Sequence, residues 1–219
     1  MTARRDVGST VCLAMLTVGL VALAGTNVGA GDSQVSIGIY RIPYEDGTQV
    51  RVTHDHRTHQ PPNRLDLIGL GSMNRSPRVV AAASGVVRHI VDEFNERQDA
   101  RTARQCNNNY VWLEHPNPNG EWTKYSHLQQ DSVRGKAKLN VGDTVQVGTY
   151  LGDEGDVGCA SRSHLHFEVA VPRDPADPIT RTGGFIKGEN RVPLICGLRE
   201  QVLVARNTYT AAKCSNASP

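Results

Sequence analysis

Short apolar runs, each followed within a few positions by Gly, Pro, Asn or Asp, fill the chain after residue 30. Such runs lie at residues 31–58, 79–91, 110–128, 139–151 and 163–171. Alternation with a period of two is typical of strands that bury one face, and turn-forming residues between the runs favour tight connections. Only 5% of the residues are aromatic and 21 are Gly. We therefore predict a β-rich fold.

The composition excludes several classes of protein. The chain has 219 residues, of which 38% are apolar, and a formal net charge of +2. A disordered chain would be poorer in apolar residues, and a coiled coil would be rich in Ala, Glu, Lys and Leu at heptad spacing. The small net charge does not indicate nucleic-acid binding. We expect one domain over residues 31–171, with a core at 50–171, and a C-terminal extension over 172–219.

Residues 1–30 have the features of a secretory signal peptide. Arg4 and Arg5 precede the apolar stretch Val11–Ala24, and Val28–Ala30 offers a small-residue cleavage site. Cleavage after Ala24 is the second possibility. The alternative is an uncleaved membrane anchor, but the apolar stretch is shorter than the roughly 20 residues that a spanning helix needs. We therefore expect a secreted or periplasmic protein without stable membrane insertion.

Removal of the signal peptide would leave four cysteines, which are Cys106, Cys159, Cys196 and Cys214. An even number in an exported chain favours two disulfide bonds. Three pairings are possible, and we favour Cys106–Cys159 with Cys196–Cys214, because the second bond closes a short loop near the C-terminus. The alternative is a structural zinc site, against which the absence of C-x-x-C spacing argues.

The segment 163–169, with the sequence SHLHFEV, combines strand alternation with two histidines. In a strand, His164, His166 and Glu168 share one face, and the apolar residues share the other. Two imidazoles on one face can converge on a metal ion, since each neutral ring offers a lone pair. The alternative is a pair of inert surface histidines. For Glu168 we weigh a contact with a ligand ring against exposure to solvent.

The segment 59–66, with the sequence HQPPNRLD, offers a second set of possible ligands. A catalytic zinc ion takes three protein ligands and keeps one open position. His59, Asp66 and one histidine of the H-x-H pair would supply that number. On its own, the segment also suits a polar loop with a turn-forming Asp. His54 and His56 lie close enough in sequence to replace His59 as a ligand.

A third segment, Tyr125–Leu128, ends the hairpin predicted for residues 110–128. Alternation would place Tyr125 and His127 on one face. Taken alone, His127 would be a surface histidine. We assign His89 and His115 to structure, because the first alternates with valines in a strand and the second begins a turn.

Taken in order, these segments resemble the lysostaphin-type zinc endopeptidases, the LytM-like enzymes that cut peptides in bacterial cell walls. The family pattern is an early His…Asp pair, a phrase such as GTPV.A..GVV, then Y.HL, Gly-rich hairpins and HLHFE. The matching segments are His59 with Asp66, residues 77–87, 125–128, 141–148 with 152–158, and 164–168. The resemblance covers residues 50–171.

The resemblance implies an all-β fold, an antiparallel sheet and hairpin architecture like a duplicated hybrid motif. It also implies that His59, Asp66 and His166 bind Zn²⁺ and that His127 and His164 are catalytic. The expected reaction is hydrolysis of peptide bonds in peptidoglycan by metal-activated water. The resemblance does not divide the work between the two catalytic histidines.

The sequence departs from the compact family motif G-x-H-x-G-x-D, in which the Asp follows the His by four positions. Here Asp66 follows His59 by seven positions and His56 by ten, and the Gly between them is missing. His56 therefore stays an alternative ligand. Two other functions also stay open: a non-catalytic relative that binds the wall or activates an amidase, and an extracellular β-domain whose histidines store metal.

Overall fold

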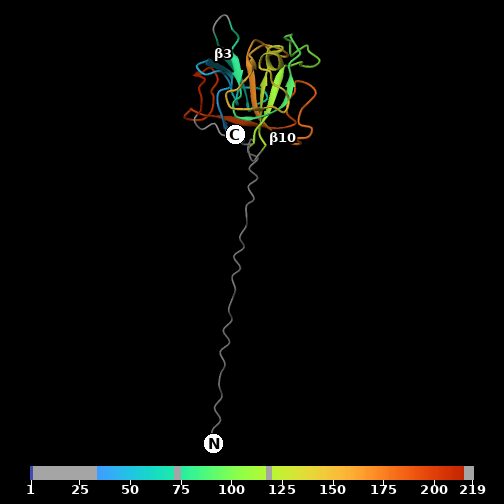
Figure 1. The fold of residues 1–219 in the computed structure, drawn as a ribbon. Helices are drawn as coiled ribbons and strands as arrows, with labels where there is room; N and C mark the ends of the chain where they lie inside the picture. Colours follow the sequence, from blue (N-terminus) through green and yellow to red (C-terminus); the bar gives the residue numbers. More distant parts are fainter. Residues whose placement is uncertain (2–33, 72–74, 117–119, 215–219) are drawn as a thin grey trace. The chain divides into compact units, whose positions relative to one another are not determined.

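The computed structural model describes Met1 and residues 34–71, 75–116 and 120–214. Its contacts divide the chain into two units, Met1–Asp32 and Ser33–Pro219. Apart from Met1, the expected signal peptide lies outside the described residues, and so do both cleavage sites. Figure 1 shows the second unit as a set of strands, and the fold described below is the fold of this unit.

Twelve strands and one helical turn form the described part of this unit. They are β1 Val35–Tyr40, β2 Gln49–His54, β3 Arg64–Leu70, β4 Arg78–Val80, β5 Gly85–Val91, β6 Tyr110–Glu114, β7 Trp122–Ser126, η1 Ser132–Lys136, β8 Thr144–Val145, β9 Tyr150–Asp153, β10 Leu165–Pro172, β11 Gly188–Ile195 and β12 Thr208–Thr210.

Ten strands form one sheet, in which eight follow the order β12-β2-β3-β10-β7-β6-β5-β8. Neighbours along this path are antiparallel. β11 pairs with the end of β10 beyond β3, and β1 lies parallel along the other edge of β11. β4 and β9 form a separate antiparallel ribbon. The all-β, antiparallel fold is therefore confirmed, with β1–β11 as a parallel pair.

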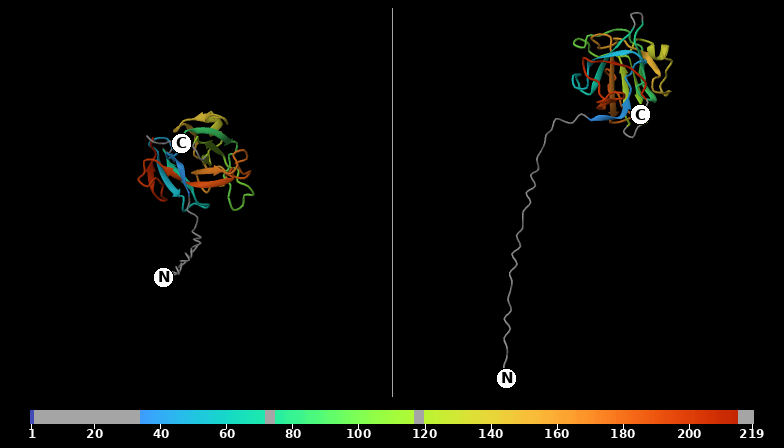
Figure 2. Two further views of the ribbon diagram at one scale, coloured as in Figure 1. Left: turned by 90° about the horizontal axis from the view of Figure 1, so that it is seen from below. Right: turned by 90° about the vertical axis from the view of Figure 1, so that its left-hand side faces the viewer.

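The expected apolar runs become strands. The run at 79–91 divides into β4 and β5, and the run at 110–128 forms the β6–β7 hairpin. Three strands were not predicted. β3 begins inside the segment that we interpreted as a polar loop, and β11 and β12 lie in the C-terminal extension. Figure 2 shows the red C-terminal strand β12 beside β2, so the extension completes the edge of the main sheet.

The two faces of the sheet pack against different clusters. One face belongs to the large core, to which β10 contributes Leu165, Phe167 and Val169. The other face carries a small aromatic cluster made of Tyr110, Trp112, Trp122, Ala170 and Ile186. Ile186 comes from residues 173–187, the loop between β10 and β11. Alternation along β10 therefore turns its polar residues toward the second face.

The cysteines pair as favoured from the sequence. Cys106 is bonded to Cys159, and Cys196 is bonded to Cys214. The first bond joins the polar insertion between β5 and β6 to the loop before β10. Within the described residues, no helix has the length and apolar character needed to cross a bilayer.

Candidate active site

Asp66 of β3 lies between two histidines on the second face of the sheet. It is the direct strand partner of His166 on β10 and of His54 on β2. Leu65 and Leu67, its neighbours in sequence, are buried in the large core. Because side chains alternate along a strand, burial of the two leucines turns Asp66 to the opposite face. The apolar pattern thus fixes which side chains can meet the carboxylate.

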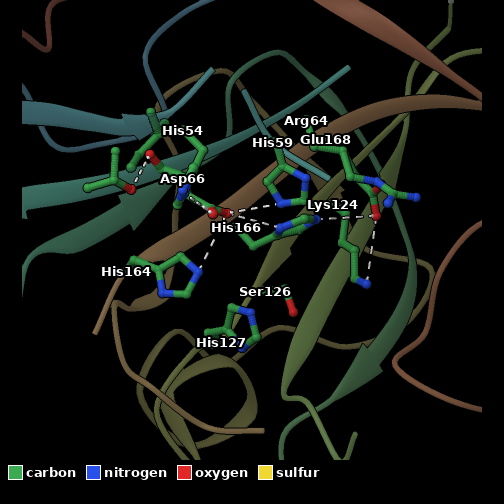
Figure 3. Close-up of polar contacts among 12 residues, drawn as sticks. His54, His59, Arg64, Asp66, Lys124, Ser126, His127, His164, His166 and Glu168 are labelled. Carbon is green, nitrogen blue, oxygen red and sulfur yellow. Dashed lines mark hydrogen bonds and ion pairs between the residues drawn. The ribbon is translucent and has the colours of Figure 1, made fainter. Parts of the chain in front are cut away.

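The expected metal ligands converge on one another (Figure 3). Asp66 Oδ1 lies 3.4 Å from His59 Nε2 and 3.2 Å from His166 Nδ1. The donor atoms of these three residues all lie within 4.8 Å of one another. Zinc bonds of roughly 2.0–2.2 Å in a tetrahedron separate neighbouring donors by about 3.3–3.5 Å. The two distances from Asp66 match this separation, and the two histidine donor atoms lie within 4.8 Å of each other, so the three side chains can hold a zinc ion with one open position.

His59, and not His56, brings its ring to Asp66. His59 Nδ1 is hydrogen-bonded to the carbonyl of Pro61 at 2.8 Å, which leaves Nε2 directed at the carboxylate. His54 contacts the other carboxylate oxygen, with Nδ1 2.9 Å from Oδ2, and its side chain is 53% exposed. The arrangement matches the ligand set expected from the resemblance, and the ligand roles themselves stay a prediction.

His127 and His164 form a second pair beside these ligands. Their ring centroids are 4.7 Å apart. His127 Nδ1 bonds the carbonyl of Val157 at 2.7 Å, and His164 Nδ1 bonds the carbonyl of Arg162 at 2.8 Å. A carbonyl only accepts, so these bonds assign a proton to each Nδ1. Nε2 of each ring is then the atom available for proton exchange, and His164 Nε2 lies 3.5 Å from Asp66 Oδ1.

The structure corrects the expected position of His127. Tyr125 does not share its face: Tyr125 packs on Phe167 in the large core, and its hydroxyl accepts a bond from the Ala82 amide. β7 ends at Ser126, and His127 has a φ of 66°, in the left-handed region. This conformation breaks the alternation and turns the ring to the second face. His127 is also buried rather than a surface residue.

Charge and burial oppose each other in the site. Burial disfavours the charge of Asp66, but its contacts with His164, His166 and His59 outweigh burial and hold the pKa of Asp66 far below its usual value. In return, Asp66 raises the pKa of His59 and His164 despite their burial. Burial lowers the pKa of His127 well below its usual value, and His164 and His166 add to the effect. His127 is therefore neutral near pH 7.

A buried charged row lies next to the ligands. Arg64, Glu168 and Lys124 are direct partners on β3, β10 and β7. Glu168 Oε2 accepts from Arg64 Nε at 2.7 Å and from Asn190 Nδ2 at 2.7 Å, and Lys124 Nζ lies 3.7 Å from Oε1. Glu168 is fully buried, so exposure to solvent, one of our two expectations, is wrong. Burial opposes its charge, but Lys124 and His166 hold its pKa below the usual value.

This charged row also lies next to the expected metal ligand His166. His166 Nε2 and Glu168 Oε1 are buried without a hydrogen bond and lie 3.9 Å apart. His166 therefore keeps Nδ1 toward Asp66 and Nε2 toward a carboxylate. A carboxylate behind a ligand ring is the common arrangement around protein-bound zinc. Reasoning from the sequence missed Lys124 and Arg64, because only the strand register places them beside Glu168.

A pocket of about 320 Å³ opens over the site. Besides the five expected site residues, its walls include Ala100, Cys106, Cys159, Ser161 and Phe185. The polar insertion and the loop after β10 thus flank the ligands. A larger cavity of about 530 Å³, near Arg41 and Tyr150, contains none of the histidines.

His115, one of the two histidines that we assigned to structure, is buried away from this pocket. Its Nδ1 bonds the carbonyl of Ser84 and its Nε2 bonds Thr123 Oγ1, both at 2.8 Å. Both ring nitrogens are satisfied within the fold, which confirms a structural part for this residue.

Several solved structures resemble this chain. The catalytic domain of the prophage-encoded M23 protein EnpA from Enterococcus faecalis is 19% identical, with a TM-score of 0.42, over 68% of this chain and 92% of that one. A zinc-containing peptidase from Vibrio cholerae is 22% identical, with a TM-score of 0.41, over 61% of this chain and 37% of that one. The catalytic domain of lysostaphin from Staphylococcus simulans is 20% identical, with a TM-score of 0.34, over 60% and 80%.

The chain spans less than half the length of the Vibrio cholerae structure. Among curated proteins, no relative matches. The family model described as peptidase family M23 matches residues 70–178, which include His127, His164 and His166 and begin after Asp66. Through the domain that these residues form, the chain belongs to peptidase family M23.

Proposed function

We propose that this protein is an exported zinc endopeptidase that hydrolyses peptide bonds in the cross-links or stem peptides of peptidoglycan. One observation supports this most strongly. A pocket of an M23 domain holds two imidazoles and a carboxylate close together, beside a histidine pair whose Nδ1 atoms are bonded to backbone carbonyls, which leaves Nε2 of each ring as the atom for proton exchange. A metal-storing β-domain would not need the second pair.

Three residues would hold the metal, namely His59, Asp66 and His166. When bound there, zinc would polarise the scissile carbonyl and make a water molecule more acidic. His127 and His164 would supply the proton acceptor and the hydrogen-bond donor that the hydrolysis needs. Their Nδ1 bonds to backbone carbonyls hold the rings in one orientation, so little reorganisation is required during the reaction.

Export and domain limits belong to the same proposal. Residues 1–30 would be removed as a signal peptide, residues 31–171 would form the peptidase domain, and 172–219 its extension. Two disulfide bonds support an oxidising compartment outside the cytoplasm.

The proposal is tested on the purified protein in two steps. We expect about one zinc ion per chain, lost in Asp66→Ala, because removal of one of three ligands weakens metal binding severely. We then expect release of peptides from purified sacculi, which stops with a chelator, returns with zinc, and is absent in His164→Ala. Zinc binding without release, or equal release by His164→Ala, would instead identify a non-catalytic or unrelated function.

A further inference from the structure

We propose that the Cys106–Cys159 disulfide is a positioning element of the active site, which clamps the two backbone segments that orient His127. The inference rests on the proposed function, since it gives His127 a part in the reaction. It assigns the disulfide an effect on catalysis that is separate from metal binding.

His127 is held from two sides. Its backbone amide donates to the carbonyl of Asn109 at 2.9 Å, and its ring Nδ1 donates to the carbonyl of Val157 at 2.7 Å. The residue has a φ of 66°, a conformation that a residue other than Gly adopts rarely and keeps only when its surroundings hold it there. The direction of Nε2 therefore depends on the relative position of two segments that are distant in sequence.

The disulfide joins those same two segments. Cys106 precedes Asn109 by three positions, and Cys159 follows Val157 by two. The Cys159 amide also donates to Asn108 Oδ1 at 3.1 Å. Movement between the two cysteines would thus separate the two carbonyls that fix the histidine.

Backbone bonds and a close approach complete the clamp. The Gly158 amide donates to the carbonyl of Glu96 at 2.9 Å, and the Gln98 amide donates to the carbonyl of Gly158 at 2.7 Å. Gly158 has a φ of 85°, and a Cβ on it would lie 1.8 Å from Asn108 Oδ1. A side chain at this position would be strained at this φ and would clash with Asn108, so Gly suits the close approach of the insertion to the loop before β10.

The expected metal ligands do not belong to the two segments that the disulfide joins. His59 lies in the loop after β2, Asp66 lies on β3, and His166 lies on β10. Both strands are held by the ladder of the main sheet. Opening the disulfide should therefore misplace His127 while the ligand set remains in place.

The test compares two double variants, Cys106→Ser/Cys159→Ser and Cys196→Ser/Cys214→Ser. Each removes one disulfide, but only the first touches the clamp. For both we would measure kcat and KM on soluble peptidoglycan peptides and zinc affinity by competition with a chelator. The imidazole ¹⁵N shifts of the zinc-loaded proteins would report the His127 tautomer.

For the first variant we expect kcat to fall about 10–100-fold, because small displacements of a reacting group have effects of this size. We expect its zinc affinity to stay within about twofold and the Nδ1–H signature of His127 to be lost. The second variant should keep kcat and the signature. If the first variant does not fold, the second variant reduced with a phosphine serves instead: only its Cys106–Cys159 bond can open, so kcat should fall on reduction and recover on reoxidation.

Unchanged kcat and an unchanged His127 signature in the first variant, or in the reduced second variant, would overturn the proposal. An equal loss of kcat in both double variants, or parallel loss of zinc, would also overturn it, since the disulfide would then act through overall stability or the metal. A wild-type protein that binds zinc but does not hydrolyse peptides would refute the proposed function. The ¹⁵N signature would still test whether the Cys106–Cys159 disulfide orients His127.

Discussion

Asp66 is the residue on which most of the site's contacts meet. Its Oδ1 faces His59, His164 and His166, while its Oδ2 is taken by His54. Because His54 occupies one oxygen, the carboxylate presents the other to the ligand histidines. We infer that His54 orients Asp66 without binding the metal itself.

Replacing His54 by Ala should therefore weaken zinc binding by about 10–100-fold, the usual effect of losing such a supporting contact. A competition titration with a zinc chelator measures this. His56→Ala is the matched control, since its ring does not belong to the ligand cluster found among the described residues. Equal affinities of His54→Ala and the wild type would show that Asp66 needs no support.

Glu168 forms ion pairs with two buried cationic side chains, those of Arg64 and Lys124. Glu168→Ala would leave both without their carboxylate, and breaking a buried pair in this way costs about 3–5 kcal/mol of unfolding free energy. Urea unfolding checks the value. As a control, Asp177→Ala removes the exposed pair with Lys187 and should cost less than about 1 kcal/mol. Similar losses in both variants would contradict a structural part for the buried row.

Spacing and resemblance singled out five residues that the structure brings into one pocket, and their roles stay a prediction. They were not enough to predict the surroundings. The turn of His127 away from Tyr125 depends on a single left-handed residue, and local alternation gives no sign of it. In the sequence, Lys124 cannot be told from any other polar strand residue. It is buried because a loop distant in sequence, which contains Gly183, covers it.

At the scale of elements, β10 carries the site because it lies between β7 on one edge and β3, followed by β11, on the other. Residues 165–168 pair with β3, whereas residues 169–172 pair with β11. β10 and the hairpin were predictable from alternation and turn residues. β3, β11 and β12 were not, because they follow Pro-rich or polar segments and are held by pairing with distant strands.

The loop of residues 173–187 covers the second face beside the site. Lys124 Nζ donates to the carbonyl of Gly183 at 2.7 Å, and Trp112 Nε1 donates to that of Gly184 at 2.9 Å. Phe185 lies 4.2 Å from Lys124 Nζ, at cation–π distance. The loop therefore closes the aromatic cluster and forms a wall of the pocket.

Gly184→Ala should lift this loop from the sheet, because a Cβ at Gly184 would lie 2.2 Å from the ring of Tyr110. Trp112 would gain exposure, so we expect a red shift of the tryptophan emission. Gly197→Ala is a control for backbone strain alone: its φ is also positive, at 73°, but nothing lies within 4 Å of the added Cβ. Identical spectra of the two variants would contradict the covering role.

At the scale of the molecule, the C-terminal segment is tied to the loop that holds His59. Asp55 Oδ2 accepts from the Ala205 amide at 2.9 Å, while Oδ1 accepts from the amides of Arg57 and Thr58. Although burial opposes its charge, the hydrogen bonds from Ala205 and Thr58 lower the pKa of Asp55 to about 2. This single carboxylate links regions at opposite ends of the described chain.

The low pKa of Asp55 predicts how stability depends on pH. The unfolded chain binds a proton near pH 3.8 and the folded one only near pH 2, so the contribution is complete above 3.8 and disappears as pH falls through 2. In Asp55→Asn this contribution is absent at every pH. We expect the Tm difference between the wild type and this variant to shrink between pH 4 and pH 2. A constant difference would show that Asp55 is not held as an anion.

For the whole molecule, the fold class was predictable from the sequence, but the full arrangement of the strands was not. The order of motifs indicated the family, and apolar runs indicated an all-β fold. The closing of the sheet by β11 and β12 was not predictable, because their polar outer faces resemble loop sequence and their partners are distant. The two disulfides were predictable as a count, and the preferred pairing followed from the short C-terminal loop.

The central claim is that His59, Asp66 and His166 bind one zinc ion in this pocket. An anomalous-difference map from crystals grown with zinc, recorded on both sides of the zinc absorption edge, tests it directly. The account predicts one strong peak at bonding distance from His59 Nε2, Asp66 Oδ1 and His166 Nδ1. No peak there, or a peak bound by other residues such as His54 or His56, would contradict it.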